Sequence, residues 1–220
     1  MNQFIKNNWL YYLLYLIIVS WAVYYLLQFD KVTLHLKINK LVGNPAIDTF
    51  FKYFTHVGDG IFAILLGVVV LIINLRKGIY ILCSYIVSGL FTSFLKNYFY
   101  DHINRPHFVF GYFVQNAKIK YVEGVDMVGQ NSFPSGHSTS AFAVFTCLAL
   151  LSNNIFFKML FFVLAVVCAF SRTYLSQHWL VDITMGSAIG VITATLFYFV
   201  FMHTTKFQKL NKPLFNFKTT

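Results

Sequence analysis

Long apolar stretches, separated by shorter polar ones, make up most of this chain. Six apolar blocks cover residues 9–27, 50–75, 79–95, 141–151, 155–170 and 180–202. A helix needs about 20 mainly apolar residues to cross the hydrocarbon core of a bilayer, and the short fourth block approaches this length if it begins near Ser138. The pattern predicts an all-α fold, a polytopic bundle of six transmembrane helices in one integral-membrane domain covering residues 1–220.

The polar stretches between the blocks indicate how the helices are connected. Residues 30–48 mix charged and apolar side chains, as in an interfacial loop with short amphipathic pieces. Arg76, Lys77 and Gly78 form a short basic turn, so the second and third blocks are expected to pair as a helical hairpin. The first block could also be read as a signal peptide, but its apolar run is longer than an h-region and no small-residue cleavage site follows it.

Composition supports a membrane protein. Charged residues make up 11% of the chain, less than half of the roughly 25% that is usual in soluble domains. The formal net charge is +10, but the basic residues lie between apolar blocks and in the tail instead of forming one basic face. We therefore expect the lipid bilayer and an anionic membrane substrate as partners, and no nucleic acid. Cys83, Cys147 and Cys168 lie inside apolar blocks without metal or disulfide spacing, which indicates packing residues.

Six crossings would place the loops after the third and fifth blocks on the same face of the membrane. These two loops hold nearly all of the unusual polar residues, so one active site is expected at that face. The basic residues assigned to the opposite face are Lys6, Arg76, Lys77, Lys158, Lys206, Lys209, Lys212 and Lys218. By the positive-inside rule, we expect a multi-pass protein of a bacterial inner membrane, with cytoplasmic termini and a periplasmic or extracytoplasmic active site.

Residues 131–141 predict a phosphate-binding turn. They combine proline, glycine, histidine and several hydroxyl groups, and they run directly into an apolar block, as a tight turn before a helix start does. The first backbone N–H groups of a helix lack partners, and the helix dipole adds partial positive charge there, so such a start binds anions. His137 would lie at this anion site.

A histidine and an aspartate are spaced for general-base or nucleophilic chemistry. Asp182 follows His178 by four residues at the start of the sixth block, which predicts that both lie on one face of a helix. The carboxylate would accept the proton of one imidazole nitrogen and direct the other nitrogen toward a substrate. The alternative is a structural His–Asp cap. The other six acidic residues show no metal-ligand clustering, so no metal or other cofactor is expected.

Three basic residues are candidates for binding phosphoryl oxygens. Arg172 precedes His178 by six residues, and alone it could be a membrane-edge anchor. Lys96 and Arg105 lie on the same predicted face, after the third block. A phosphoryl group in transfer needs several cations around its oxygens, so these residues and the two histidines predict phosphoryl transfer without a metal.

Two motifs resemble those of a known family. The sequence Pro134-Ser-Gly-His137, followed by Ser171-Arg172 with His178 and Asp182, resembles the second and third signature motifs of the type 2 phosphatidic acid phosphatases. These are membrane lipid phosphatases related to vanadium haloperoxidases. The resemblance covers the chain from about Phe50 through the sixth block.

The family's first motif is only partly present. It usually has a lysine, six residues and then Arg-Pro, whereas eight residues separate Lys96 from Arg105-Pro106 here and Tyr98 occupies the usual lysine position. Arg105 carries over with its intact Arg-Pro pair. Lys96 carries over only if the loop accommodates two extra residues, which costs little closure entropy. His102 and His107 are interpreted as polar loop residues, with contact to a substrate headgroup as the alternative.

The resemblance implies a two-step reaction. His178, oriented by Asp182, would attack phosphorus and form a phosphohistidine, while His137 protonates the departing oxygen. The expected phosphate-binding groups are Lys96, Arg105, Arg172, the Ser135 hydroxyl and the Gly136 backbone N–H. The glycine lets the backbone come close to the anion.

The expected substrate is a lipid phosphate or diphosphate in the membrane. An envelope lipid such as undecaprenyl diphosphate or lipid A is favoured, with phosphatidic acid or phosphatidylglycerophosphate as the alternative. Two readings from other classes remain. One is a catalytically silent lipid-binding or transport protein, and the other is a haloperoxidase-like pocket for vanadate, against which the membrane setting argues. The sequence leaves the oligomeric state open.

Overall fold

The computed structural model describes residues 2–114 and 118–215, and in this part of the chain the regular structure is all helical. Lys218, one of the predicted cytoplasmic lysines, lies outside the described residues. The α-helices are α1 (Asn2–Gln28), α2 (Lys31–Asn39), α3 (Pro45–Phe54), α4 (Gly60–Ile73), α5 (Leu75–Tyr98), α6 (Pro106–Tyr112), α7 (Gly136–Leu151), α8 (Ile155–Tyr174) and α9 (Leu180–Tyr198). A 3-10 turn, η1 (Thr55–Gly58), joins α3 to α4, and the π-helix η2 (Phe199–His203) and the 3-10 turn η3 (Thr205–Leu210) follow α9.

Helix α7 forms the centre of the bundle and packs against α5, α8 and α9. Small residues permit this close packing, and Ala143 and Ala149 of α7 are fully buried. A Cβ atom on Gly190 of α9 would lie 2.6 Å from the Thr139 carbonyl oxygen and 2.7 Å from the Ala143 amide nitrogen. Helices in lipid associate through such close backbone contact instead of through exclusion of water, so Gly190 is required where α9 crosses α7.

The predicted number of membrane crossings is only partly matched. Within the described residues, four helices are long and apolar enough to cross a membrane: Gln3–Gln28, Leu75–Tyr98, Ile155–Tyr174 and Leu180–His203. A fifth candidate is the pair Pro45–Gly58 and Gly60–Ile73, which is bent by 56°. The predicted block at residues 50–75 is thus broken at Asp59, and α7, the expected fourth crossing, has 16 residues. The chain is a membrane protein, with four or five candidate spans by length and composition.

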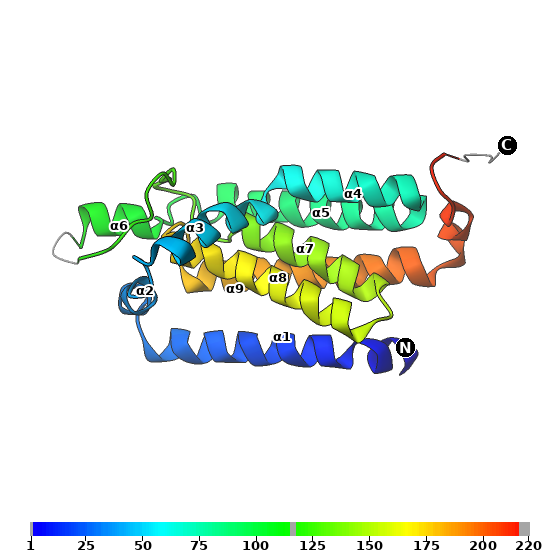
Figure 1. Ribbon diagram of the computed structural model, residues 1–220, viewed down its shortest axis with the longest axis horizontal. Coiled ribbons are helices and arrows are strands. Elements are labelled where there is room, and N and C mark those ends of the chain that lie inside the picture. Colours follow the sequence, from blue (N-terminus) through cyan, green and yellow to red (C-terminus); the bar gives the residue numbers. More distant parts are fainter. Residues whose placement is uncertain (1, 115–117, 216–220) are drawn as a thin grey trace.

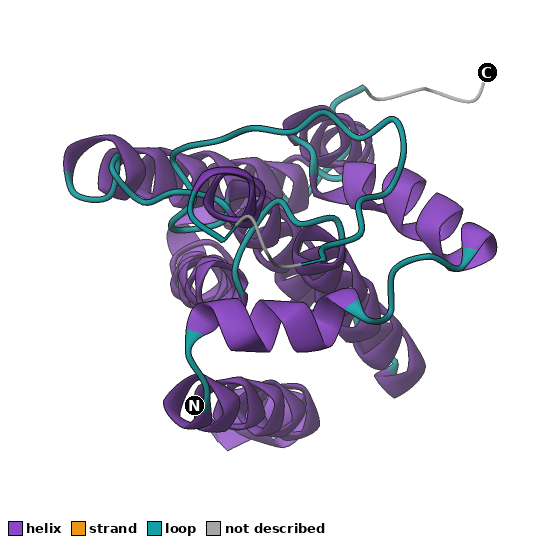
Figure 2. Ribbon diagram, turned by 90° about the vertical axis from the view of Figure 1, so that its left-hand side faces the viewer, coloured by secondary structure: helices purple, strands orange, loops and turns teal. Residues whose placement is uncertain are grey.

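The polar segment after α1, where a loop with short amphipathic pieces was predicted, contains the short helices α2 and α3. Asp30 begins α2 by accepting hydrogen bonds from the Val32 and Thr33 amides, both at 2.9 Å. Figure 2 views the bundle from the end at which α2 lies and shows α2 lying across it. His35 of α2 is buried against Trp179, and its Nε2 lies 3.1 Å from the Ser176 hydroxyl. Burial lowers the pKa of His35 to about 4, so a neutral ring braces the α8–α9 connection.

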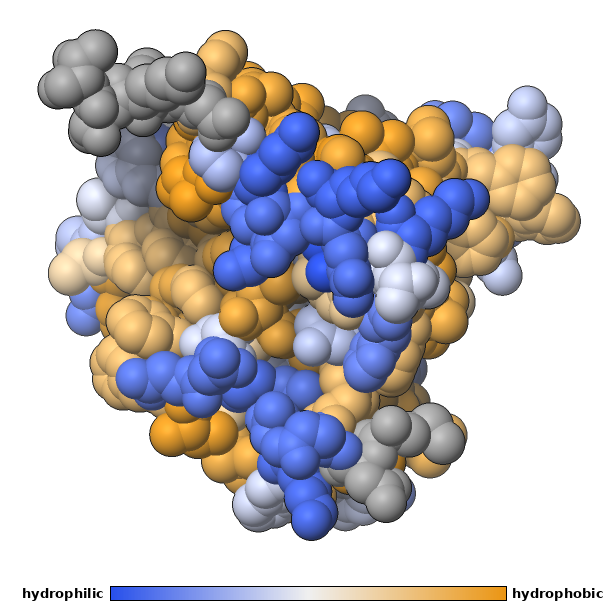
Figure 3. Space-filling view, turned by 90° about the vertical axis from the view of Figure 1, so that its right-hand side faces the viewer, coloured by the Kyte–Doolittle hydropathy of each residue, from blue (hydrophilic) through white to orange (hydrophobic). Residues whose placement is uncertain are grey.

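The two ends of the bundle differ in their loops. The α1–α4 connections, α6 and the α8–α9 connection gather at one end, and both termini lie at the other (Figure 1). At the end with the termini, hydrophilic side chains gather beside apolar surface (Figure 3). Arg76 fixes this end by donating from Nε to the Phe201 carbonyl at 2.7 Å. The bundle therefore brings the loops after the third and fifth blocks to one end, as the sequence predicted.

Candidate active site

His178 and Asp182 form a buried pair, although not on one helix as predicted. Helix α9 begins at Leu180, so His178 precedes it, and Asp182 lies in its first turn. Asp182 Oδ2 accepts the Trp179 amide N–H at 2.9 Å and the Ser132 hydroxyl at 2.5 Å, and it lies 3.2 Å from His178 Nδ1. A helix-capping arrangement, rather than the i, i+4 spacing along a helix, therefore sets the geometry of the pair.

The environment of His178 favours a neutral ring with a free lone pair. When Nδ1 donates to Asp182, Nε2 becomes the ring nitrogen available to a substrate. Burial of the ring, and then the positive charges of Arg105 and Arg172, lower the pKa of His178 well below its ordinary value of 6.5. A neutral, oriented imidazole is the form that can attack an electrophile.

Most of the predicted site residues meet at one cavity of about 420 Å³, here called the catalytic cavity. The predicted residues that line it are Lys96, Arg105, Gly136, His137, Arg172 and His178. They come from the end of α5, the start of α6, the start of α7, the end of α8 and the α8–α9 connection. The fold thus brings residues from all of these segments of the sequence to one cavity.

The two arginines are held by neutral partners. Arg172 is 7% exposed and donates from one terminal nitrogen to the Thr55 hydroxyl at 2.7 Å. Its Nε is buried and has no hydrogen-bond partner among the described residues. Arg105 donates from Nε to the Gln130 carbonyl at 2.9 Å and from a terminal nitrogen to Gln177 Oε1 at 3.2 Å. Neither guanidinium is neutralised by a carboxylate in these contacts, so both can bind an anion in the cavity.

The structure also shows how the chain accommodates the altered first motif. Helix α5 continues two residues past Lys96 to Tyr98, and the Lys96 side chain lines the catalytic cavity. Tyr98, at the usual lysine spacing, is 76% exposed. The Arg105 amide then bonds the Gly129 carbonyl at 2.9 Å, which fixes the end of the longer connection. The Lys96 side chain therefore reaches the cavity, and its role as a phosphate ligand stays a prediction.

Ser135 and the loop histidines are placed differently from the phosphate-facing residues. Ser135 is fully buried and caps α7, where its hydroxyl accepts from the Ser138 amide at 3.4 Å and from the Ser138 hydroxyl at 3.0 Å. It is not among the residues that line the catalytic cavity, and contact between its hydroxyl and phosphate stays a prediction. His102 and His107 are also not among the lining residues. The helix start predicted within residues 131–141 is confirmed, and it lies at Gly136.

Two residues that the sequence analysis did not select contact the site. Thr55 accepts the hydrogen bond from Arg172, and Asp59 Oδ1 lies 2.6 Å from His137 Nε2. The sequence signal for Asp59 was weak: an acidic residue between two glycines, Gly58 and Gly60, just before an apolar block. Within the described part of the chain, no group of three or more His, Cys, Asp or Glu residues is arranged to hold a metal ion.

A second cavity of about 390 Å³ adjoins the first and is here called the lateral groove. It shares Lys96, Gly136 and His137 with the catalytic cavity, and it continues along α5 past Leu90, which is 65% exposed. The groove therefore connects the polar site to the apolar side of the bundle.

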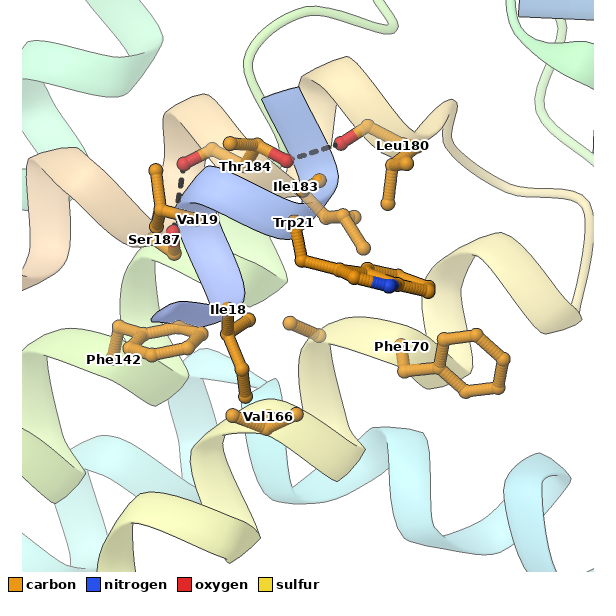
Figure 4. Close-up of a pocket in the computed structure, with 12 residues that line it drawn as sticks. Ile18, Val19, Trp21, Phe142, Val166, Phe170, Leu180, Ile183, Thr184 and Ser187 are labelled. Carbon is orange, nitrogen blue, oxygen red and sulfur yellow. Dashed lines mark hydrogen bonds between the residues drawn. The ribbon is translucent and has the colours of Figure 1, made fainter. Parts of the chain in front are cut away.

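A third cavity, of about 170 Å³, lies between α1, α7, α8 and α9 and is almost entirely apolar (Figure 4). Its polar lining residues are Thr184 and Ser187, whose hydroxyls donate to the backbone carbonyls of Leu180 and Thr184 at 2.8 and 2.7 Å. No titratable side chain lines it, so it lacks the groups for acid–base or nucleophilic chemistry.

A comparison with known protein families matches the region of the chain that contains these motifs. A family model described as the PAP2 superfamily matches residues 77–206, more than half of the chain. The chain belongs to the PAP2 superfamily. The matched region of this PAP2 protein contains all of the predicted site residues, and it leaves out Thr55 and Asp59.

Two relatives of this PAP2 protein have names that refer to lipids. The Escherichia coli (strain K12) protein named "Putative undecaprenyl-diphosphatase YbjG" is 34% identical over 104 residues, which are 47% of each chain. A lipid A 1-phosphatase of Porphyromonas gingivalis is 31% identical over 77 residues, 34% of this chain and 17% of the relative. The chain spans about half or less of the length of the curated relatives it matches.

Solved structures share the fold. LpxE from Aquifex aeolicus superposes with a TM-score of 0.65 at 23% identity, covering 76% of this chain and 93% of that one. A PAP2-type phosphatidylglycerolphosphate phosphatase from Bacillus subtilis gives 0.62 at 20% identity, covering 92% and 99%. These likenesses support the PAP2 fold for most of this chain.

Proposed function

We propose that this PAP2 protein is a membrane lipid phosphatase that hydrolyses a phosphate or diphosphate ester through a phosphohistidine. The observation that carries the proposal is the convergence of Lys96, Arg105 and Arg172 with two histidines on one cavity. Three cations match the oxygens of a phosphoryl group, and one neutral histidine with a carboxylate partner supplies the nucleophile.

In the first step, His178 Nε2 attacks phosphorus and the bond from phosphorus to the lipid oxygen breaks. His137 donates a proton to that oxygen, so the lipid leaves as an alcohol or as a lipid monophosphate. In the second step, water attacks the phosphohistidine, His137 accepts a proton from the water, and inorganic phosphate leaves while His178 is regenerated. Lys96, Arg105, Arg172 and the Gly136 backbone N–H stabilise the phosphoryl oxygens throughout.

The substrate that we propose is an envelope lipid, either an isoprenoid diphosphate such as undecaprenyl diphosphate or lipid A. Relatives named for undecaprenyl diphosphate and lipid A support this choice. The lateral groove supports a lipid substrate, since it leads from His137 to exposed apolar side chains of α5. Phosphatidic acid or phosphatidylglycerophosphate is the alternative substrate, and the fold of the Bacillus subtilis phosphatase keeps it in consideration.

The test is phosphate release by the detergent-purified protein from these four lipids in mixed micelles containing EDTA. We expect release to persist in EDTA and kcat/KM to be highest for an envelope lipid. Because the pKa of His178 lies well below 6.5, its ring stays neutral at pH 6.5 and above, and the acid limb of kcat/KM is expected below pH 6.5. Abolition of release by EDTA would contradict the mechanism. Absence of release from every lipid would favour the silent lipid-binding alternative.

We further propose six crossings, with both termini in the cytoplasm and the catalytic cavity on the extracytoplasmic side. The polar connections gather at one end of the bundle and the termini at the other, which supports placing the cavity and the termini on opposite sides of the membrane. Helices α4 and α7 would complete the six, although each is shorter than about 20 residues. A reporter enzyme active only in the cytoplasm, fused after Thr220, is expected to be active. A periplasmic reporter that is active in the same position would overturn the orientation.

A further inference from the structure

The site contains a second histidine–carboxylate pair. His137 Nε2 lies 2.6 Å from Asp59 Oδ1, and these side chains are 30% and 33% exposed. The pair of His178 and Asp182 is almost fully buried, with side chains 2% and 0% exposed. Both His137 and Asp59 line the lateral groove, whereas His178 lines only the catalytic cavity. The second pair therefore lies on the side from which the proposed lipid leaving group extends.

The backbone on both sides of Asp59 is fixed by close packing. A Cβ atom on Gly58 would lie 2.8 Å from Cys168 Sγ and 3.0 Å from the His137 carbonyl oxygen. A Cβ atom on Gly60 would overlap the Tyr85 hydroxyl. The carboxylate of Asp59 also accepts from His56 Nδ1 at 2.7 Å, which satisfies its second oxygen. Asp59 is thus held beside His137 by contacts with α5, α7 and α8.

The charges around His137 explain why a carboxylate is needed there. Lys96, Arg105, Arg172 and His178 line the same cavity, and the cationic side chains among them disfavour a positive charge on the His137 ring. Asp59 is the only carboxylate within ion-pair distance of His137 in the described part of the chain. It opposes the cations and stabilises the imidazolium, the form that can donate a proton.

We propose, on the basis of the phosphatase function above, that Asp59 is the positioning residue that stabilises the protonated form of His137, the acid for the leaving group. Asp59 accepts the Nε2–H, and the proton on Nδ1 passes to the lipid oxygen as the bond from phosphorus to oxygen breaks. The ring is then neutral and keeps its Nε2–H, and Nδ1 takes a proton from the attacking water in the second step. Asp59 remains ionised throughout.

The two pairs thus have opposite tasks. Asp182 also accepts from Ser132 and from the Trp179 amide, and in this buried position it orients a neutral His178. Asp59 sits in a more exposed position and stabilises a charged His137. An acid and a nucleophile with opposite protonation states can therefore coexist in one cavity.

The test uses Asp59→Asn and two substrates of equal chain length in mixed micelles. One is an alkyl phosphate monoester, whose alcohol needs a proton to leave. The other is the phosphate monoester of a nitrophenol that carries the alkyl chain on its ring, and this nitrophenolate leaves without a proton. We expect kcat for the alkyl phosphate to fall by about 10²-fold with little change in KM, because general acid catalysis is worth that much. Turnover of the nitrophenyl ester is expected to change little, and it also reports that the variant is folded.

Asp101→Asn is the matched control, since it removes the same charge from an exposed aspartate whose one ion pair in the described structure is with His102. It is expected to leave both rates unchanged. Equal losses on both substrates in Asp59→Asn would assign Asp59 a merely structural role, and unchanged turnover of the alkyl phosphate would exclude any role in protonation. Either result overturns the inference while the phosphatase function stands. A wild-type protein that releases phosphate from neither substrate would instead overturn the proposed function itself.

Discussion

Replacing His178 with asparagine is expected to lower kcat/KM for lipid phosphate by about 10⁴-fold or more, because the variant lacks the nucleophile. Asparagine is the appropriate replacement, since its amide nitrogen can occupy the place of Nδ1. The hydrogen bond to Asp182 Oδ2, now 3.2 Å long, can then persist. The capping interaction between Asp182 and the Trp179 amide also remains, so α9 should begin at the same residue. The loss of activity is therefore expected without unfolding.

Two measurements check this result. Phosphate release gives the rate, and quenching in alkaline detergent after mixing with a lipid radiolabelled in its phosphate group shows whether a protein-bound phosphate that is stable to alkali and labile to acid forms. We expect labelling of the wild type and none of His178→Asn. His203→Asn is the control, because this exposed histidine lies in η2, at the other end of the bundle. If His178→Asn retained the wild-type rate, the attacking group would lie elsewhere and the phosphohistidine mechanism would be wrong.

The parts of the site that are local in sequence could be predicted from it. The helix start at Gly136 and the pairing of His178 with Asp182 both depend on residues only a few positions apart. Even so, the i, i+4 interpretation placed His178 on a helix, whereas the structure ends the preceding connection at Trp179 and uses Asp182 as a cap. Period-based reasoning assigns residues to a helix, but it does not resolve the first turn, where side chains compete with backbone groups for hydrogen bonds.

The contacts made by the Thr55–Asp59 segment could not be predicted in this way. Asp59 and His137 are far apart in the chain, and the packing of η1 and α4 against α7 brings them together. The apolar block at residues 50–75 also concealed the bend, because the long apolar run that begins at Ile61 makes the block as a whole apolar enough for one span. For Lys96, the spacing in the sequence alone did not determine whether the side chain reaches the cavity. The last turn of α5 determines it, by directing Lys96 inward and leaving Tyr98 exposed.

Arg172→Lys is expected to lower kcat/KM by about 10²- to 10³-fold, the usual loss on removing one donor to a transition-state oxygen. The positive charge is kept, so any loss reports the geometry of the guanidinium. One terminal nitrogen of Arg172 is bound to the Thr55 hydroxyl at 2.7 Å, while the buried Nε has no partner among the described residues. A lysine ammonium cannot be held by Thr55 and also present a second, fixed donor to phosphate.

Vanadate, which can adopt the five-coordinate geometry of phosphorus during the transfer, separates transition-state binding from substrate binding in this variant. We expect its inhibition constant to rise by a factor similar to the loss in kcat/KM, while KM changes less. The reason is that the fixed N–H donors of the Arg172 guanidinium contribute most when negative charge accumulates on the phosphoryl oxygens. Arg76→Lys is the matched control, since Arg76 binds backbone carbonyls at the other end of the bundle. If Arg172→Lys kept both kcat/KM and vanadate inhibition near the wild-type values, positive charge alone would suffice at this position. The fixed contact with Thr55 would then have no part in holding the phosphoryl group.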